Sequence, residues 1–146
     1  MPYGTQQQVA TMASTWTDDG VWGEYSNPTL LEVEGWLGDI SAQFDLALGA
    51  HFFVFPIDPA RSPTAYKAVS QYVVNLVADL CNFKNSSGRF FTEKLVELGM
   101  TPWAAILKDI NKWIELNANG LVADNVPQIE RPSIRNQPLF RVMSKP

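Results

Sequence analysis

The stretch from Thr29 to Leu48, TLLEVEGWLGDISAQFDLAL, constrains the fold more than any other part of the chain. Pro28 disfavours helical backbone at the residue before it, so a helix can begin only after the Asn-Pro pair. Thr29 and Glu32 then match the capping box, in which two side chains satisfy free amides of the first turn. Apolar residues follow at three- and four-residue steps, which places them on one face of an α-helix. These residues are Val33, Trp36, Leu37, Ile40, Phe44, Ala47 and Leu48.

Two glycines, Gly35 and Gly38, interrupt this predicted helix. Each lowers helix propensity by about 1 kcal/mol relative to alanine. A helix that keeps both is held by tertiary packing, or it lets a neighbouring helix or subunit approach its backbone closely. The C-terminal end is predicted near Gly49, a residue that suits a left-handed helix cap.

The same periodicity predicts further helices. A short helix over residues 5–14 would use Thr5 and Gln8 as its capping pair. A long helix begins at Ser62-Pro63, where serine is a preferred cap and proline is tolerated at the first helical position, and runs to about residue 80 or 81. A shorter helix is expected over about residues 89–98. The last one begins after Thr101-Pro102 and ends near residues 117–120.

Two connections between these helices are rich in aromatic residues. Residues 16–28 contain turn-forming glycines together with Trp22 and Tyr25, so this loop either covers the core or docks on a neighbour. Residues 50–63 contain three prolines, which exclude most sheet pairing. We expect this second segment to be a buried, apolar connection.

The helical periodicity stops after Gly120. Prolines at positions 127, 132, 138 and 146 break helices and favour extended backbone. The segment still contains more apolar residues than a freely solvated tail would. The sequence therefore predicts an all-α protein: a small bundle of about four main helices over residues 1–120, followed by an extended, proline-rich C-terminal arm over residues 121–146.

The distribution of charge limits the function. Residues 1–130 hold 7 basic and 15 acidic residues, whereas residues 131–146 hold four basic residues and no acid, so −8 and +4 give the net −4. An acidic body disfavours general nucleic-acid binding. The low charged fraction of 18% and the 17 aromatic residues (five Trp, eight Phe and four Tyr) fit either a well-filled core or surface buried against partners. No apolar run approaches the roughly 20 residues of a membrane span, and we expect no signal peptide.

The side chains that carry most enzyme chemistry are scarce. The chain has one histidine, His51, and one cysteine, Cys81, which excludes an internal disulfide and most zinc arrangements. Asp58 is the acid nearest to His51 in sequence. We expect His51 to hydrogen-bond local backbone in a packed turn and Cys81 to be a buried thiol. The sequence thus predicts a protein that is not an enzyme and that has no cofactor and no metal site.

The C-terminal arm is the strongest functional signal. Its cations alternate with apolar residues, a pattern typical of a segment that lies on another protein surface. That surface belongs either to a partner or to the chain's own domain. The predicted interface residues are Arg131, Ile134, Arg135, Leu139, Phe140, Arg141 and Val142 in the arm, with Trp22 and Tyr25 in the aromatic loop.

Residues 27–49, NPTLLEVEGWLGDISAQFDLALG, and the aromatic-proline turn that ends at Pro56 resemble the head–tail connector (adaptor) proteins of tailed bacteriophages. The resemblance covers roughly residues 27–80, and the rest of the chain matches by architecture alone. The matching positions are Thr29, Val33, Glu34, Ile40, Ser41, Ala42, Phe44, Asp45, Leu48, Phe53 and Pro56.

The resemblance implies a structural virion protein. It implies a homo-oligomeric, dodecameric ring beneath the portal protein, joined to a stopper or tail-completion protein, with DNA passing through the channel without specific binding. The C-terminal arm would engage the portal or a neighbouring subunit. The location implied is the neck of the virion, and the host cytoplasm during assembly. The alternatives are another phage neck or tail-completion protein, a helical binding module, and a small hydrolase or transferase that uses His51 and Asp58.

Overall fold

The computed structural model describes residues 2–23, 25–91 and 102–129. Within these ranges the secondary structure consists of helices without strands, which confirms the predicted all-α class. The helices are α1 (Gln6–Met12), α2 (Leu30–Ala50), α3 (Pro63–Lys84) and α5 (Trp103–Ala123), with a short 3₁₀ turn at Ser14–Trp16. The helix predicted over residues 89–98 lies mostly outside the described residues.

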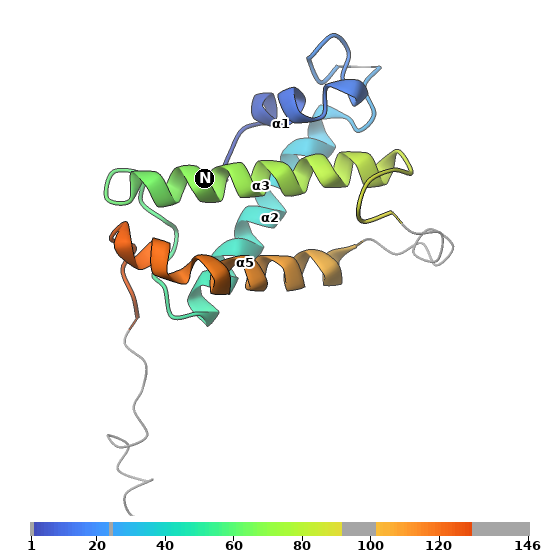
Figure 1. Cartoon of the computed structure of the whole chain (residues 1–146). Helices are drawn as coiled ribbons and strands as arrows, with labels where there is room; N and C mark the ends of the chain where they lie inside the picture. Colours follow the sequence, from blue (N-terminus) through green and yellow to red (C-terminus); the bar gives the residue numbers. More distant parts are fainter. Residues whose placement is uncertain (1, 24, 92–101, 130–146) are drawn as a thin grey trace, which may run out of the picture.

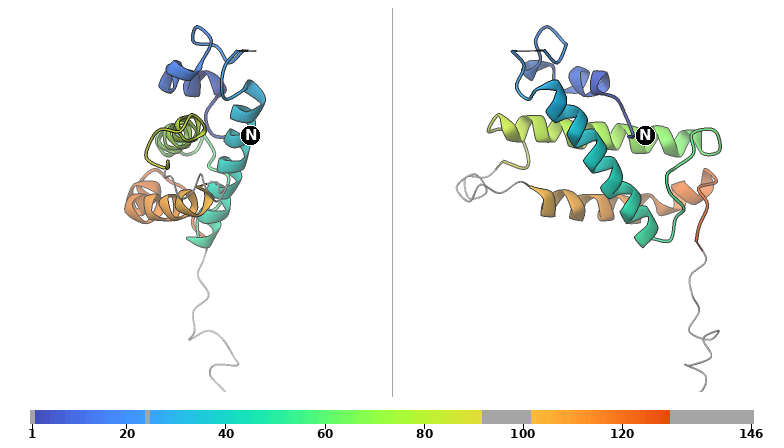
Figure 2. Two further views of the ribbon diagram at one scale, coloured as in Figure 1. Left: turned by 90° about the vertical axis from the view of Figure 1, so that its right-hand side faces the viewer. Right: turned by 180° about the vertical axis from the view of Figure 1, so that it is seen from behind.

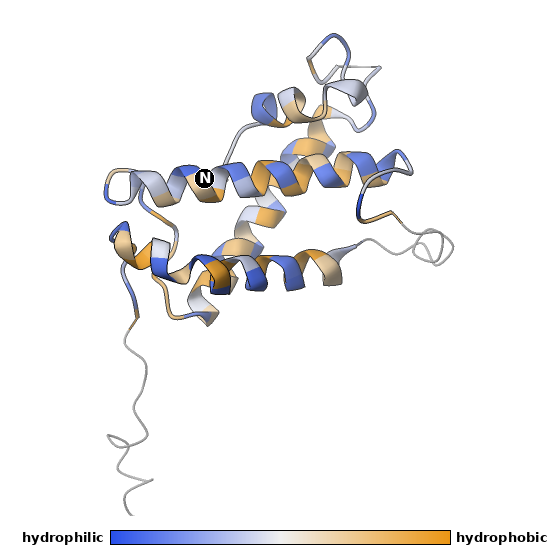
Figure 3. Cartoon of the chain, viewed as in Figure 1, coloured by the Kyte–Doolittle hydropathy of each residue, from blue (hydrophilic) through white to orange (hydrophobic). Residues whose placement is uncertain are grey.

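The helices form two layers. Helices α1, α3 and α5 lie side by side, and α3 and α5 run in opposite directions (Figure 1). Helix α2 crosses this layer diagonally and contacts all three of its members (Figure 2). One side of α2 therefore packs on the bundle, and the opposite side faces away from it. Hydrophobic and hydrophilic residues alternate along the ribbon of α5, as expected for an amphipathic helix (Figure 3).

The start of α2 is as predicted, and its end is not. The Thr29 side chain accepts a hydrogen bond from the Glu32 amide, and the Glu32 side chain accepts one from the Thr29 amide, which completes the capping box. The prediction that Gly49 caps the C-terminal end is wrong, because the helix continues to Ala50 and His51 is the cap residue. Gly49 has another role: an added Cβ would lie 2.7 Å from Cε1 of Phe55, so the glycine admits that ring.

The start of α3 is capped by a residue from the other end of the chain. Ser62 precedes Pro63 as predicted, yet its side chain makes no capping hydrogen bond. Instead, Oδ2 of Asp124 accepts a hydrogen bond from the Ala65 amide at 2.7 Å. A carboxylate suits this position because the first amides of a helix are unpaired and carry partial positive charge.

The core is built around Phe44 of α2, which is fully buried. Its ring lies 5.8 Å from Tyr3, 6.0 Å from Tyr72 and 5.6 Å from Trp113, and Tyr72 stacks on Trp113 at 5.0 Å. These rings come from the N-terminal segment, α2, α3 and α5. One cluster of aromatic side chains therefore joins both layers. Trp36, which was predicted to share the core face, is only half-buried and packs at the edge of the core.

Tyr3 fixes the N-terminal segment to this core. Its amide donates to Oγ of Ser41 at 2.9 Å. Its hydroxyl donates to Oδ1 of Asp45 at 2.5 Å and accepts from the Ile57 amide at 3.0 Å. The segment before α1 is thus tied to the middle of α2 and to the connection that follows α2.

The helical domain extends past the boundary predicted at residue 120. Helix α5 continues to Ala123, and Leu121 and Val126 are buried. The Val54 amide donates to the Pro127 carbonyl at 2.8 Å, and the Ile129 amide donates to the Phe52 carbonyl at 2.7 Å. Residues 121–129 therefore belong to the folded body. The rest of the predicted arm, residues 130–146, lies outside the described residues.

Candidate functional site

The aromatic loop places its two predicted interface residues in opposite environments. The Trp22 side chain is 4% exposed, and its indole nitrogen donates to the Gln6 carbonyl at 2.9 Å. Trp22 is therefore a core residue, and its prediction as an interface residue is wrong. Tyr25 is 85% exposed and remains a candidate. The sequence could not separate the two, because both are aromatic residues in a glycine-rich loop.

This loop is anchored on the C-terminal end of α3. Nε1 of Trp16 donates to Oδ1 of Asn82 at 2.8 Å. Nδ2 of Asn27 donates to Oδ1 of Asn85 at 3.0 Å, and Nδ2 of Asn85 donates to the Asn27 carbonyl at 2.8 Å. These three long-range hydrogen bonds lie before and after Tyr25 in the chain. They fix the loop on α3, so the exposed Tyr25 side chain has a defined position.

Large apolar side chains also face solvent on the helices. Leu31 and Leu46 on α2 are 80% and 61% exposed, and Leu116 on α5 is 74% exposed. Covering these side chains with another protein would remove apolar surface from water, which is favourable. The two glycines between the α2 leucines are open as well: a Cβ added to Gly35 or Gly38 would meet no atom within 4 Å. Within the described part of the chain, no helix makes the close approach that these glycines would allow.

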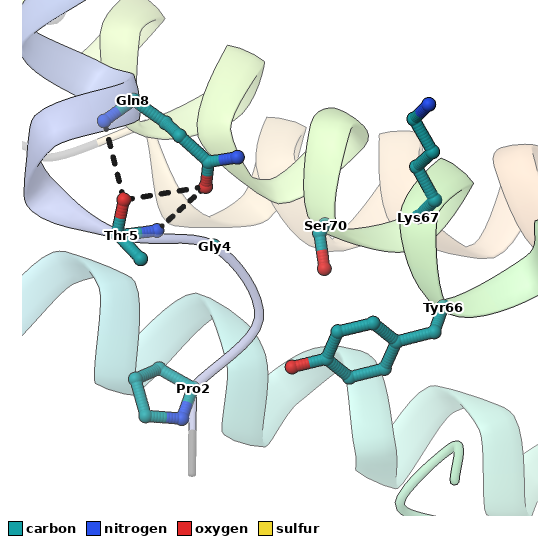
Figure 4. A pocket seen from close by; sticks show the side chains of 7 residues that line it. All are labelled: Pro2, Gly4, Thr5, Gln8, Tyr66, Lys67 and Ser70. Carbon is teal, nitrogen blue, oxygen red and sulfur yellow. Dashed lines mark hydrogen bonds between the residues drawn. The ribbon is translucent and has the colours of Figure 1, made fainter. Parts of the chain in front are cut away.

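A pocket of about 470 Å³ separates the N-terminal segment from α3 (Figure 4). Pro2, Gly4 and Gln8 line one side, and Tyr66 and Ser70 line the other. The Ser70 side chain is 8% exposed, and its buried hydroxyl has no hydrogen-bond partner. Its oxygen points into the pocket in Figure 4, whereas the Lys67 amine points away from it. The pocket thus offers one unpaired hydroxyl in a mostly apolar lining.

His51 and Cys81 have structural environments. We predicted that His51 would bond local backbone. Instead, its Nε2 lies 3.1 Å from Oδ1 of Asn111, a side chain of α5. Asp58 accepts a hydrogen bond from the Ala60 amide, 2.9 Å away, within its own turn. Cys81 is buried, as expected, and burial raises the pKa of its thiol to about 12. A thiol that is protonated at neutral pH is a poor nucleophile.

Among the described residues, a group of charged side chains joins α3, α5 and the segment after α3. Nε of Arg89 lies 2.8 Å from Oδ2 of Asp79, and its Nη1 lies 3.4 Å from Oδ1 of Asp109. The Tyr72 hydroxyl donates to Oδ2 of Asp109 at 2.5 Å. Burial raises the pKa of Asp79, and the neighbouring Arg89 partly opposes the shift. Each charged group already has a partner from another element, so the group holds the bundle together.

The described residues lack two kinds of feature. No group of three or more histidine, cysteine, aspartate or glutamate side chains within 2–23, 25–91 and 102–129 is placed to hold a metal ion. In the same ranges, no helix has the length and apolar content that crossing a membrane requires. The predicted interface residues of the arm, Arg131 to Val142, lie outside the described residues.

The candidate site is therefore a set of surfaces: Tyr25 on its anchored loop, Leu31 and Leu46 on α2, and Leu116 on α5. Comparison of the chain with protein-family models, with curated proteins and with solved structures finds no match.

Proposed function

We propose that this protein is a structural component of a tailed-phage virion: a head–tail adaptor whose copies form a ring between the portal and the next neck component. The observation that carries the proposal is the exposure of Tyr25, Leu31, Leu46 and Leu116 on a domain whose core is already filled. Because these side chains lie on the loop, on α2 and on α5, partners that covered them would each remove apolar surface from water, which is favourable. The resemblance of residues 27–56 to adaptor proteins supplies the identity of those partners.

The charge of the folded body fits a channel through which DNA moves. Residues 1–130 carry a net charge of −8. Cations that neutralise DNA phosphates release counterions and so produce binding, whereas an acidic wall offers no such gain. A ring of these domains would let DNA slide without being held. The four cations of residues 131–146 are the natural candidates for contact with the portal or with a neighbouring subunit.

A reconstitution with the portal protein of the same genome tests the proposal. Purified protein is mixed with portal rings, and the product is imaged by electron cryomicroscopy. We expect a ring of density beneath the portal. The chain with residues 130–146 deleted should remain folded but should not join the ring. Protein that stays monomeric in the presence of the portal, at concentrations well above those in an infected cell, would contradict the proposal.

Surface substitutions give a matched control for that experiment. Tyr25→Ser and Leu116→Gln each remove one exposed apolar side chain without disturbing the core. If either side chain lies in a ring contact, the variant should assemble less well than the parent at equal concentration. Lys108→Gln, on the exposed side of α5, should assemble as well as the parent. A helical binding module that acts as a monomer is the alternative, and it would show no ring in any sample.

A further inference from the structure

Helix α2 is apolar on two opposite sides. Its inner side contains Val33, Leu37, Ile40 and Phe44, all buried against the bundle. With 3.6 residues per turn, steps of three and four residues keep positions on the same face. A second set of residues, all exposed, follows the same spacing on the outer side of the helix. This outer face consists of Leu31, Gly35, Gly38, Ala42 and Leu46.

Acidic side chains border the outer face of α2. Glu34 lies on one side of it and Asp39 on the other, and both are exposed. Helix α2 contains four acids and no basic residue in its sequence, LLEVEGWLGDISAQFDLALGA. A hollow of about 320 Å³, lined by Asp39, Ala42, Gln43 and Trp103, adjoins the face. The surface therefore combines apolar contact area with negative charge on both edges.

The C-terminal segment has the complementary chemistry. Residues 131–146 hold four cations and no acid, and they interleave these cations with Ile134, Leu139, Phe140, Val142 and Met143. Of the four acids of α2, Glu32 is paired with Lys84 and Asp45 accepts a hydrogen bond from Tyr3, so Glu34 and Asp39 are the two exposed acids available to this positive segment. Opposite charge along the edges of an apolar contact favours one orientation and partner over others.

The last described residue, Ile129, lies close to the C-terminal end of α2, so residues 131–146 can start along α2 from that end. The Ile129 amide donates to the Phe52 carbonyl at 2.7 Å, and Phe52 lies just beyond the end of α2. The outer face from Leu46 to Leu31 is about 22 Å long. Residues 131–146 can span roughly 50 Å when extended, so they can cover the whole face. A tethered segment also has an effective concentration in the millimolar range, which favours the chain's own helix over that of another molecule.

We propose that residues 131–146 dock on the outer face of α2 of the same chain. The apolar residues of the segment cover Leu31 and Leu46 and pack over Gly35 and Gly38, where the absence of side chains allows a close approach. The arginines lie along the edges, near Glu34 and Asp39. The docking requires no portal and no second copy, so it is tested on the isolated chain. The adaptor proposal would then require residues 131–146 to leave α2 when the ring forms, which frees Leu31 and Leu46 for a partner.

Nuclear magnetic resonance on the full chain tests this docking. Spectra of the isotope-labelled full chain and of the chain lacking residues 130–146 are compared at several protein concentrations. We expect the deletion to shift the amide signals of Gly35, Gly38 and Ala42 and to leave that of Lys108 on α5 unchanged. The shifts should not depend on concentration. Unchanged α2 signals would overturn the proposal, and concentration-dependent shifts would replace it with binding to a second copy.

Paired variants show which contacts hold the segment. Leu31→Gln combined with Leu46→Gln should move the amide signals of residues 131–146 toward their positions in an unfolded peptide. Leu116→Gln, which changes an equally exposed leucine on α5, should leave them in place. Glu34→Gln combined with Asp39→Asn should weaken the docking and remove its salt dependence. Segment signals that are the same in the parent and in all three variants would exclude the outer face of α2 as the docking site.

Discussion

At the scale of single residues, the glycines show how much the environment decides the effect of one side chain. Gly4 has a φ of +79°, and an added Cβ would lie 2.5 Å from Cγ2 of Val74. Gly120 lies inside α5, and an added Cβ would meet no atom within 4 Å. The first glycine is required by its backbone conformation and by its packing, whereas the second only lowers helix propensity.

Alanine substitutions at these two glycines should therefore have opposite effects. Gly4→Ala should lower the free energy of unfolding by about 1–3 kcal/mol, through strain at positive φ and overpacking. Gly120→Ala should raise it by about 0.5–1 kcal/mol, because alanine is the better helix former. Urea denaturation followed by circular dichroism measures both values. A stabilised Gly4→Ala variant would show that the N-terminal segment does not pack on α3 in solution.

Asp45 gives the fold a pH dependence of known sign. Burial raises the pKa of its carboxyl group, and the hydrogen bond from Tyr3 partly opposes the shift. The folded state therefore binds the Asp45 proton more tightly than the unfolded state. Protonation of Asp45 thus stabilises the fold, and this contribution is fully present below the ordinary aspartate pKa of about 3.9. It is lost as the pH rises through the raised pKa of the folded state.

Replacing Asp45 with asparagine should remove that contribution. Relative to Asp45→Asn, the parent should lose stability as the pH rises from the ordinary aspartate pKa of about 3.9 through the raised pKa of the folded state. Asparagine can still accept the hydrogen bond from Tyr3. Urea midpoints measured across this range, with Asp19→Asn as an exposed control, test the sign. A difference that is constant with pH, or one that grows in favour of the parent as the pH rises, would contradict the assignment.

At the scale of elements, the sequence predicted where helices begin better than where they end. The starts of α1 and α2 depend on local capping pairs, Thr5 with Gln8 and Thr29 with Glu32, and both capping boxes are present. Gly49, which was predicted to end α2, lies inside the helix instead, and Phe55 of the next segment packs over it. No local rule could reveal that contact. For the same reason the sequence placed Trp22 at an interface: its burial depends on a carbonyl of α1.

The cap of α3 gives the clearest test at this scale. Asp124→Ala should lower the free energy of unfolding by about 1 kcal/mol, because it leaves the first turn of α3 without its acceptor. Ser62→Ala removes a hydroxyl that makes no capping hydrogen bond and should change the stability by less than about 0.5 kcal/mol. Thermal unfolding of both variants decides between a local cap and a cap supplied from beyond α5. A larger loss of stability for Ser62→Ala than for Asp124→Ala would show that Ser62 is the cap of α3.

At the scale of the whole molecule, the core and the surface impose different requirements on α2. The inner side of this helix contributes Phe44 to an aromatic cluster shared with Tyr3, Tyr72 and Trp113. The periodicity of apolar residues predicted that side correctly. The outer side was not evident from the sequence, because two glycines and an alanine separate its leucines and weaken the apolar pattern. The docking proposed here depends on that outer side and on residues 131–146, whereas the fold depends on the inner side.

The boundary between body and arm can be tested with two truncations that differ by four residues. Deleting residues 130–146 removes no buried residue of the described body and costs only the docking of the segment on α2, so the free energy of unfolding should fall by about 1 kcal/mol. Deleting residues 126–146 also removes the buried Val126 and the hydrogen bonds that join residues 127–129 to Phe52 and Val54. That loss should amount to about 2–4 kcal/mol. Equal stabilities would mean that residues 126–129 belong to the arm, and the folded body would then end with Asn125, one residue after the Asp124 that caps α3.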